Sequence, residues 1–292
     1  MKKNLKLIHI GTGKTASTTL QKIVFPKLAK YLNIQNINLN ELICNDEIKF
    51  HILENEQNFH KKLPNQFIIS NEGLFSRGWE FNKMKKSFEI LKRNFTEDTH
   101  VIIFIRKPYD FLNSIYIQSL QELKIIEPKN FFYDDVTSNK DGYNLRDISY
   151  KDLIYLYKSY FKKVDIIKFE KILDLNFLDK IENLSDEFKL ELKRDVKNNV
   201  YNKSFSNFSV KLILLISKII NLKDIDNLIA LNIKETNNFF GKIRNKFLNL
   251  FLIRNIFQNF IDKVVPYRKY LINSDYIPLD LKKLEKEYDE IS

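Results

Sequence analysis

The chain has 292 residues, of which 44% are hydrophobic, so it is globular rather than disordered and long enough for one α/β domain with additions or for two small domains. Its formal net charge of +11 favours anionic partners such as a phosphorylated nucleotide, an acidic glycan or a membrane surface, and no nucleic-acid-binding motif accompanies that charge. The single cysteine, Cys44, excludes an internal disulfide and a cysteine-rich zinc site. The N-terminus has no apolar signal core, and no run of about 18 apolar residues is present, so we expect a cytoplasmic protein.

The N-terminal stretch combines a strand, a polar loop and the start of a helix. An apolar, β-prone run ends at Ile10, and a helix is predicted over about 18–32. Backbone N–H groups in such a loop converge on one point, and the helix dipole adds positive potential there. Hydroxyl groups and one lysine supply further donors, so the stretch predicts a phosphate site. Its residues are Gly11, Thr12, Gly13, Lys14, Thr15, Ala16, Ser17 and Thr18.

The following 150 or so residues alternate between strand-like and helix-like segments. This alternation predicts an α/β fold with a parallel sheet that helices cover on both faces. The strongest strand signal is 100–105, which is apolar on both faces as a central parallel strand should be. Further strands are expected at 66–70 and 164–169, helices at 81–95, from about 110 and at 150–161, an Asn-rich loop at 33–40 and an irregular loop at 124–144.

From about residue 204 the pattern becomes helical. We therefore predict an α/β core over 1–210 and a helical extension over 211–292 that packs on the core. Within the extension, 242–265 has an apolar stripe with basic residues between its members. Two interpretations remain for this helix: it packs on the core, which we favour, or it makes peripheral contact with an anionic membrane at the inner face.

Two further signals lie at the ends of predicted strands. Arg106 ends the central strand and Ser114 follows eight residues later, so the two side chains can bind a second phosphate, the arginine as a fork and the serine as a donor. Glu72 follows the strand 66–70, where a carboxylate can accept a proton from a reacting hydroxyl. His51 and His60 are weaker candidates for this base, because no strand positions them.

These motifs resemble those of sulfotransferases that use 3′-phosphoadenylyl sulfate (PAPS). Residues 14–18, Lys-Thr-Ala-Ser-Thr, are similar to the family's 5′-phosphosulfate loop, with Gly13 in place of the usual proline and Ala16 in place of the usual glycine. Arg106 with Ser114 resembles the 3′-phosphate element, and Glu72 resembles the glutamate base of the carbohydrate-sulfating branch. Residues 202–204, Asn-Lys-Ser, resemble a segment of bacterial members in which Lys203 would touch the 3′-phosphate.

The resemblance implies a three-layer α/β fold with a central parallel sheet, related to nucleotide kinases. It further implies PAPS as co-substrate, no metal, Glu72 as the general base and Lys14 as the group that stabilises the leaving 5′-phosphate. The acceptor would be a hydroxyl or amine, and a glutamate base favours a saccharide, a glycolipid or a surface polysaccharide.

Two other functions remain open. A nucleoside-triphosphatase loop that ends in Gly13-Lys14-Thr15 requires its first glycine at position 8, where the sequence has Ile8. Such enzymes also tend to end the central strand in an acidic residue that helps to hold magnesium, where this chain has Arg106. A P-loop kinase is therefore the first alternative, and a basic module that binds membranes or anions without turnover is the second.

Overall fold

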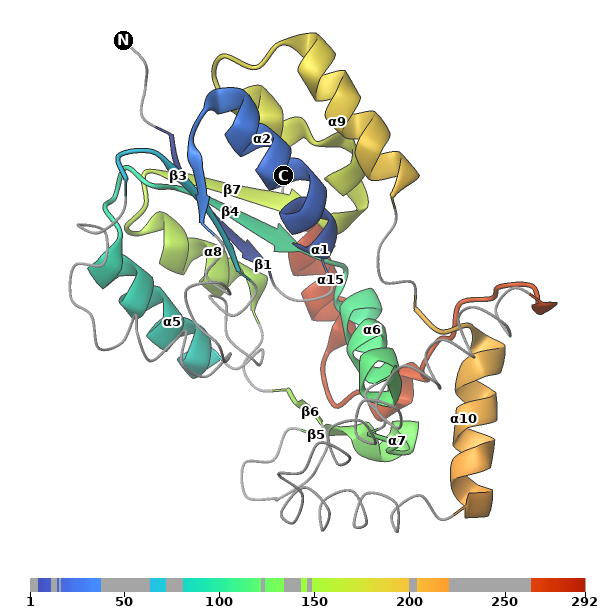
Figure 1. The fold of residues 1–292 in the computed structure, drawn as a ribbon. Coiled ribbons are helices and arrows are strands. Elements are labelled where there is room, and N and C mark those ends of the chain that lie inside the picture. Colours follow the sequence, from blue (N-terminus) through green and yellow to red (C-terminus); the bar gives the residue numbers. More distant parts are fainter. Residues whose placement is uncertain are drawn as a thin grey trace, which may run out of the picture. The chain divides into compact units, whose positions relative to one another are not determined.

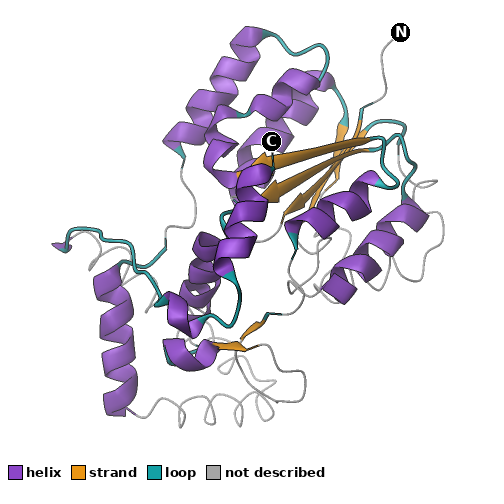
Figure 2. Ribbon diagram, turned by 180° about the vertical axis from the view of Figure 1, so that it is seen from behind, coloured by secondary structure: helices purple, strands orange, loops and turns teal. Residues whose placement is uncertain are grey.

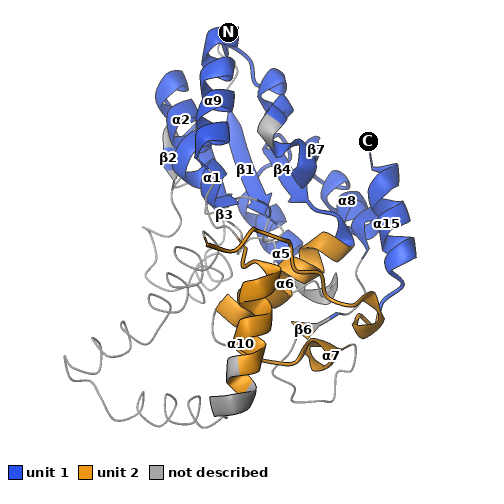
Figure 3. Ribbon diagram, turned by 90° about the vertical axis from the view of Figure 1, so that its right-hand side faces the viewer, with its two compact units in different colours: residues 1–108, 144–202, 279–292 blue, residues 109–143, 203–278 orange. Residues whose placement is uncertain are grey.

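The computed structural model describes residues 5–11, 15, 17–37, 64–71, 81–121, 124–133, 143–145, 149–199, 204–220 and 264–291. The chain forms two compact units, which Figure 3 colours separately. The first comprises Met1–Pro108, Asn144–Asn202 and Leu279–Ser292, and the second Tyr109–Tyr143 and Lys203–Pro278. This division differs from the single boundary expected at residue 210, since the last helix belongs to the first unit.

A five-stranded parallel sheet forms the centre of the first unit (Figure 1). Its strand order is β2-β3-β1-β4-β7, and the chain therefore has the α/β fold with a parallel sheet that the sequence predicts. The central strands are buried on both faces, which explains why their sequences are continuous apolar runs. The bounds are β1 Lys6–Gly11, β2 Gln35–Ile37, β3 Phe67–Asn71, β4 His100–Ile105 and β7 Lys163–Lys168.

Helices lie on both faces of this sheet. Figures 1 and 2 show α2 and α9 on one face and α5 and α8 on the other. Ser149 and Ser185 cap α8 and α9 by accepting backbone N–H groups of the first turn. The helices of this unit are α1 Ser17–Thr19, a π-helical turn η1 Leu20–Val24, α2 Phe25–Leu32, α5 Phe81–Asn94, α8 Tyr150–Lys158, the 3-10 turns η4 Phe169–Asp174 and η5 Asn176–Lys180, α9 Asp186–Asn198 and α15 Leu281–Glu290.

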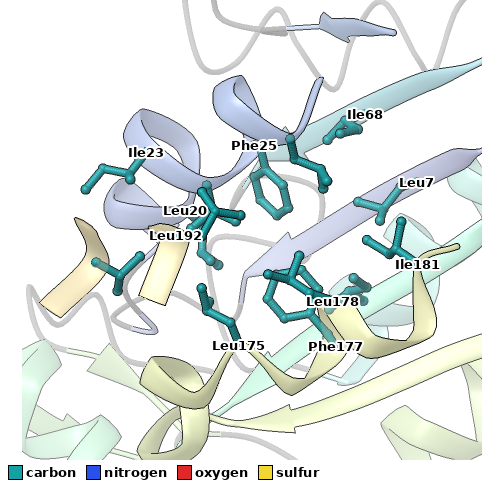
Figure 4. Close-up of a cluster of buried hydrophobic side chains, with 14 of the residues drawn as sticks. Leu7, Leu20, Ile23, Phe25, Ile68, Leu175, Phe177, Leu178, Ile181 and Leu192 are labelled. Atoms are coloured by element: carbon teal, nitrogen blue, oxygen red, sulfur yellow. The ribbon is translucent and has the colours of Figure 1, made fainter. Parts of the chain in front are cut away.

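One hydrophobic core of the first unit lies between the sheet and the layer of α2 and α9 (Figure 4). Leu7 and Ile68 from the strands are fully buried against Leu20 and Phe25, and Leu192 of α9 closes the cluster. Because strand side chains alternate between faces, the same face of β1 that carries Leu7 also carries His9. The core therefore continues to the carboxyl end of β1, where the predicted phosphate loop begins.

The second unit is mainly helical among the residues that the structure describes. Within it, the Asn113 side chain of α6 donates to the carbonyl oxygen of Tyr270 at 2.8 Å and accepts from the backbone N–H of Ile272 at 2.9 Å. These two bonds fix the segment after residue 264 to α6. The elements are α6 Pro108–Gln121, whose first residue belongs to the first unit, α7 Pro128–Phe131, the two-stranded sheet of β5 Phe132–Tyr133 and β6 Tyr143–Asn144, α10 Asn207–Ile220 and the 3-10 turn η8 Ser274–Tyr276.

Two expectations about local structure need correction, and a third concerns residues that lie almost entirely outside the described ranges. The Asn-rich stretch 33–40 contains the edge strand β2, which pairs in parallel with β3. The stretch 124–144, expected as an irregular loop, contains α7 and the strands β5 and β6. Of the predicted amphipathic helix 242–265, only residues 264 and 265 belong to the described part of the chain.

Candidate functional site

The strand order has a topological switch point at the carboxyl ends of β1 and β4. After β1 the chain passes to β2, on one side of β1, whereas after β4 it passes to β7, on the other side. In open α/β sheets, ligands bind where neighbouring strands send their connections in opposite directions. Gly11, the last residue of β1, pairs with Phe104 of β4, and Arg106 follows two residues later. The two predicted phosphate motifs thus start from the same edge of the sheet.

Two hydroxyl groups shortly after β1 are buried and have no hydrogen-bond partner among the described residues. Thr15 is fully buried and Ser17 is 1% exposed. Neither Thr15 Oγ1 nor Ser17 Oγ makes a hydrogen bond within the described residues. Each buried hydroxyl of this kind costs about 1–3 kcal/mol. A ligand that offers oxygen acceptors at this position would remove that cost, and the loop is therefore suited to an anion.

The helix after this loop is continuous to Leu32 but not uniform. Ser17 begins α1, the turn Leu20–Val24 is π-helical, and α2 then completes the helix. Single π-helical turns inside α-helices occur frequently at functional sites. Thr18 is only partly buried at the helix start. The other loop residues named above, Thr12, Gly13, Lys14 and Ala16, lie outside the described residues.

Arg106 is held in place by both its main chain and its side chain. Its carbonyl oxygen accepts a hydrogen bond from the hydroxyl of Tyr150, whose pKa burial raises well above the ordinary value. Its guanidinium lies 4.5 Å from the ring centroid of Phe169, the first residue of η4. Such stacking orients a guanidinium. The side chain is partly exposed at the end of β4, as the sequence predicts.

Ser114 lies on α6, as expected, but its hydroxyl is already bonded within that helix. Ser114 Oγ donates to the carbonyl oxygen of Asp110 at 2.7 Å, one turn earlier, and the side chain is buried. A serine in this geometry retains its acceptor lone pairs and would have to leave Asp110 to donate to a phosphate. Ser114 belongs to the second compact unit, whereas Arg106 belongs to the first.

The other predicted site residues fall outside the described ranges. β3 ends at Asn71, which pairs with Ile10 of β1, and Glu72 is the next residue in the chain. Glu72 and Lys203 themselves are not among the described residues, nor are His51 and His60.

A buried polar group that the sequence analysis missed lies next to this site. His9 Nδ1 of β1 shares a hydrogen bond of 2.7 Å with Ser70 Oγ of β3, and Gln21 Nε2 of η1 donates to the carbonyl oxygen of Ser70 at 3.3 Å. The His9 ring is fully buried, and its centroid lies 5.3 Å from that of Phe25 and 5.1 Å from that of Phe104. Burial lowers the pKa of His9 to about 3, so the imidazole is neutral. The available signal was a histidine flanked by two isoleucines in the middle of an apolar strand.

Among the described residues, no group of three or more His, Cys, Asp and Glu side chains could hold a metal ion. Within the same residues, no helix has the length and apolar character needed to cross a membrane. No family model matches the chain, and no curated protein and no solved structure is significantly similar to it. A function is therefore inferred from the site itself.

Proposed function

We propose that the protein is a sulfotransferase that moves the sulfuryl group of PAPS to a hydroxyl or amine of an acceptor. The observation that carries this proposal is the pair of buried hydroxyls, Thr15 and Ser17, that lack hydrogen bonds in the described structure at the carboxyl end of β1. They lie in the loop whose sequence resembles the 5′-phosphosulfate loop. Arg106, at the end of the neighbouring strand, supplies a cation where the second phosphate of PAPS would bind.

In the proposed reaction, some residues would bind PAPS, and others would accept the proton or stabilise the developing charge. The loop 11–18 would hold the 5′-phosphosulfate, and Arg106, Ser114 and Lys203 would hold the 3′-phosphate. PAPS supplies an activated sulfuryl group: the acceptor atom forms a bond to sulfur, while the bond from sulfur to the 5′-phosphate oxygen breaks and leaves its electron pair on that oxygen. Glu72 would take the proton of the acceptor, and Lys14 would stabilise the charge that develops on the departing phosphate.

The acceptor class follows from charge and from the choice of base. A net charge of +11 favours an acidic acceptor, and a carboxylate base matches the carbohydrate-sulfating branch of the family. We therefore propose a saccharide, a glycolipid or a surface polysaccharide as acceptor. If the acceptor is lipid-linked, the basic amphipathic segment 242–265 would bring the enzyme to the membrane, which co-sedimentation with anionic liposomes tests.

A thermal-shift titration separates this proposal from its alternatives. A ligand that binds only the folded protein raises the melting temperature. We expect adenosine 3′,5′-bisphosphate, the product left by PAPS, to raise it without magnesium, and ATP with magnesium to have no comparable effect. A shift with ATP and magnesium alone would instead favour a kinase. No shift with either nucleotide would favour a non-catalytic anion-binding module.

Replacement of Arg106 tests the second phosphate position. The change Arg106→Ala removes a charged hydrogen-bond donor, which in a partly buried site costs about 1.5–3 kcal/mol. We therefore expect the dissociation constant of adenosine 3′,5′-bisphosphate to rise about 10- to 100-fold. Arg93, exposed at the end of α5, provides the control: Arg93→Ala lowers the net charge equally and should leave the constant unchanged. Equal affinities of the two variants, measured by calorimetry, would remove Arg106 from the site.

A further inference from the structure

Ser70 is held at two of its atoms by two other elements. Its hydroxyl bonds to His9 of β1, and its carbonyl oxygen accepts the side-chain N–H of Gln21 in η1. Ser70 is the residue before the last one of β3, and it precedes Glu72 by two positions. Both bonds therefore act at the carboxyl end of β3, next to the loop after β1.

The regular pairing of the sheet does not require these polar groups. β1 and β3 are already paired in parallel register from Lys6 with Phe67 to Ile10 with Asn71. An aliphatic residue at position 9 would fill the space between the Phe25 and Phe104 rings without desolvating an imidazole. A stability disadvantage of this kind is expected where a residue is retained for function.

Gln21 connects Ser70, at the carboxyl end of β3, to the helix that follows the phosphate loop. It lies in the π-helical turn, four residues after Ser17 and three after Thr18. The π turn changes the order in which side chains face the sheet relative to an α-helix, and Gln21 reaches the end of β3 from this turn. A shift of the loop on ligand binding would therefore be transmitted to Ser70.

We propose that His9, Ser70 and Gln21 form a clamp that fixes the carboxyl end of β3, and with it the catalytic base, relative to the phosphate loop. This inference rests on the proposed sulfotransferase function. In it, His9 and Gln21 are positioning residues that act through Ser70, and none of the three needs to touch the substrate. Because the proposed base, Glu72, follows β3 directly in the sequence, loss of the clamp should affect turnover more than nucleotide binding.

Two variants of Ser70 test the clamp. Ser70→Ala removes the hydroxyl that bonds His9, whereas Ser70→Thr retains it. The probe reaction is the release of labelled sulfate from PAPS, with water as acceptor. We expect kcat of Ser70→Ala to fall about 10- to 100-fold, as a displaced catalytic group would cause, while the dissociation constant of adenosine 3′,5′-bisphosphate stays the same. Ser70→Thr should restore kcat. An unchanged kcat, or an equal loss of kcat and affinity, would overturn the proposal.

A second measurement uses the unsubstituted protein and does not depend on turnover. The chain has four histidines, so imidazole NMR signals are few, and His9→Gln and His100→Gln assign the signals of His9 and His100 by their disappearance. Adenosine 3′,5′-bisphosphate should shift the His9 signal and leave that of His100 in place. A bisphosphate that raises the melting temperature without moving the His9 signal would overturn the clamp alone. A bisphosphate that does neither would overturn the proposed function itself.

Discussion

The two ends of the same parallel sheet differ in the partners of their buried histidines. At the amino end, buried His100 of β4 donates through Nε2 to Asp165 Oδ2 of β7 at 2.8 Å, and Lys180 donates to the other carboxylate oxygen. At the carboxyl end, buried His9 shares its one described hydrogen bond with a neutral serine, and Thr15 and Ser17 have none within the described residues.

The difference indicates what each end contributes. Burial raises the pKa of Asp165, but the hydrogen bonds from His100 and Lys180 outweigh it and lower the pKa to about 2. The amino end therefore stabilises a charge with partners from its own chain. The carboxyl end keeps its imidazole neutral, and Thr15 and Ser17 have no hydrogen-bond partner among the described residues, which lowers stability in the absence of a ligand, as the hydroxyl of Thr99 does at the amino end. We infer that the amino end serves stability and the carboxyl end serves binding.

The largest effect is expected when a lysine is removed from the carboxyl end. Lys14→Ala should reduce sulfuryl transfer about 100- to 1000-fold, because in the proposed reaction this lysine would stabilise the charge that develops on the leaving phosphate in the transition state. The affinity for adenosine 3′,5′-bisphosphate should fall much less. Turnover and calorimetric binding measure the two quantities. Lys180→Ala removes a lysine from the amino end and should leave transfer unchanged; equal losses of transfer and affinity in Lys14→Ala would contradict the assigned role.

Acid unfolding should divide into two pH ranges, one for each end. His9 has a pKa of about 3 when folded, against an ordinary value of 6.5, so the unfolded chain binds a proton that the folded protein does not. Stability therefore falls as the pH decreases from 6.5 towards 3, by about 3 kcal/mol between pH 7 and pH 4. Asp165 has a folded pKa of about 2 against 3.8, so its contribution is present above pH 3.8 and is lost towards pH 2.

Denaturant unfolding of two variants assigns these ranges. The change His9→Gln should flatten the stability profile between pH 7 and pH 4, and Asp165→Asn should alter it only below about pH 4, apart from a pH-independent loss. A His9→Gln profile parallel to that of the unsubstituted protein would mean that His9 is not the group that titrates.

The parts of the fold that the sequence predicted are those in which burial alone determines the pattern. β4 is buried on both faces and therefore appears as an unbroken apolar run, and the end of this run placed Arg106 correctly at the end of the strand. β2 was missed because it is a three-residue edge strand in which a polar composition is tolerated. The π turn was missed because it depends on a shift in backbone hydrogen bonding, which leaves no periodic signal in so short a segment.

The candidate site was likewise predicted only in part from the sequence. The hydroxyls of Thr15 and Ser17 were predicted from their position after a strand, but their burial was not, because it depends on how the helix packs on the sheet. His9 was overlooked because its partner Ser70 is 61 residues away, and only the parallel pairing of β1 with β3 brings them together. The bond from Ser114 to Asp110 is local, yet whether a helical serine bonds backward or faces a ligand depends on its rotamer.

The smallest effect, and the most specific, is expected from a pair of threonines at opposite ends of the sheet. Thr15 Oγ1 and Thr99 Oγ1 are both buried without a hydrogen bond among the described residues. The change to valine removes the hydroxyl at nearly constant volume, so Thr15→Val and Thr99→Val should each raise the stability of the free protein by about 1 kcal/mol. Adenosine 3′,5′-bisphosphate should then stabilise Thr99→Val as it does the unsubstituted protein, and Thr15→Val much less. If the bisphosphate stabilised both variants equally, the unpartnered hydroxyl of Thr15 would be a packing defect like that of Thr99, and the carboxyl end would lose its main evidence for a ligand.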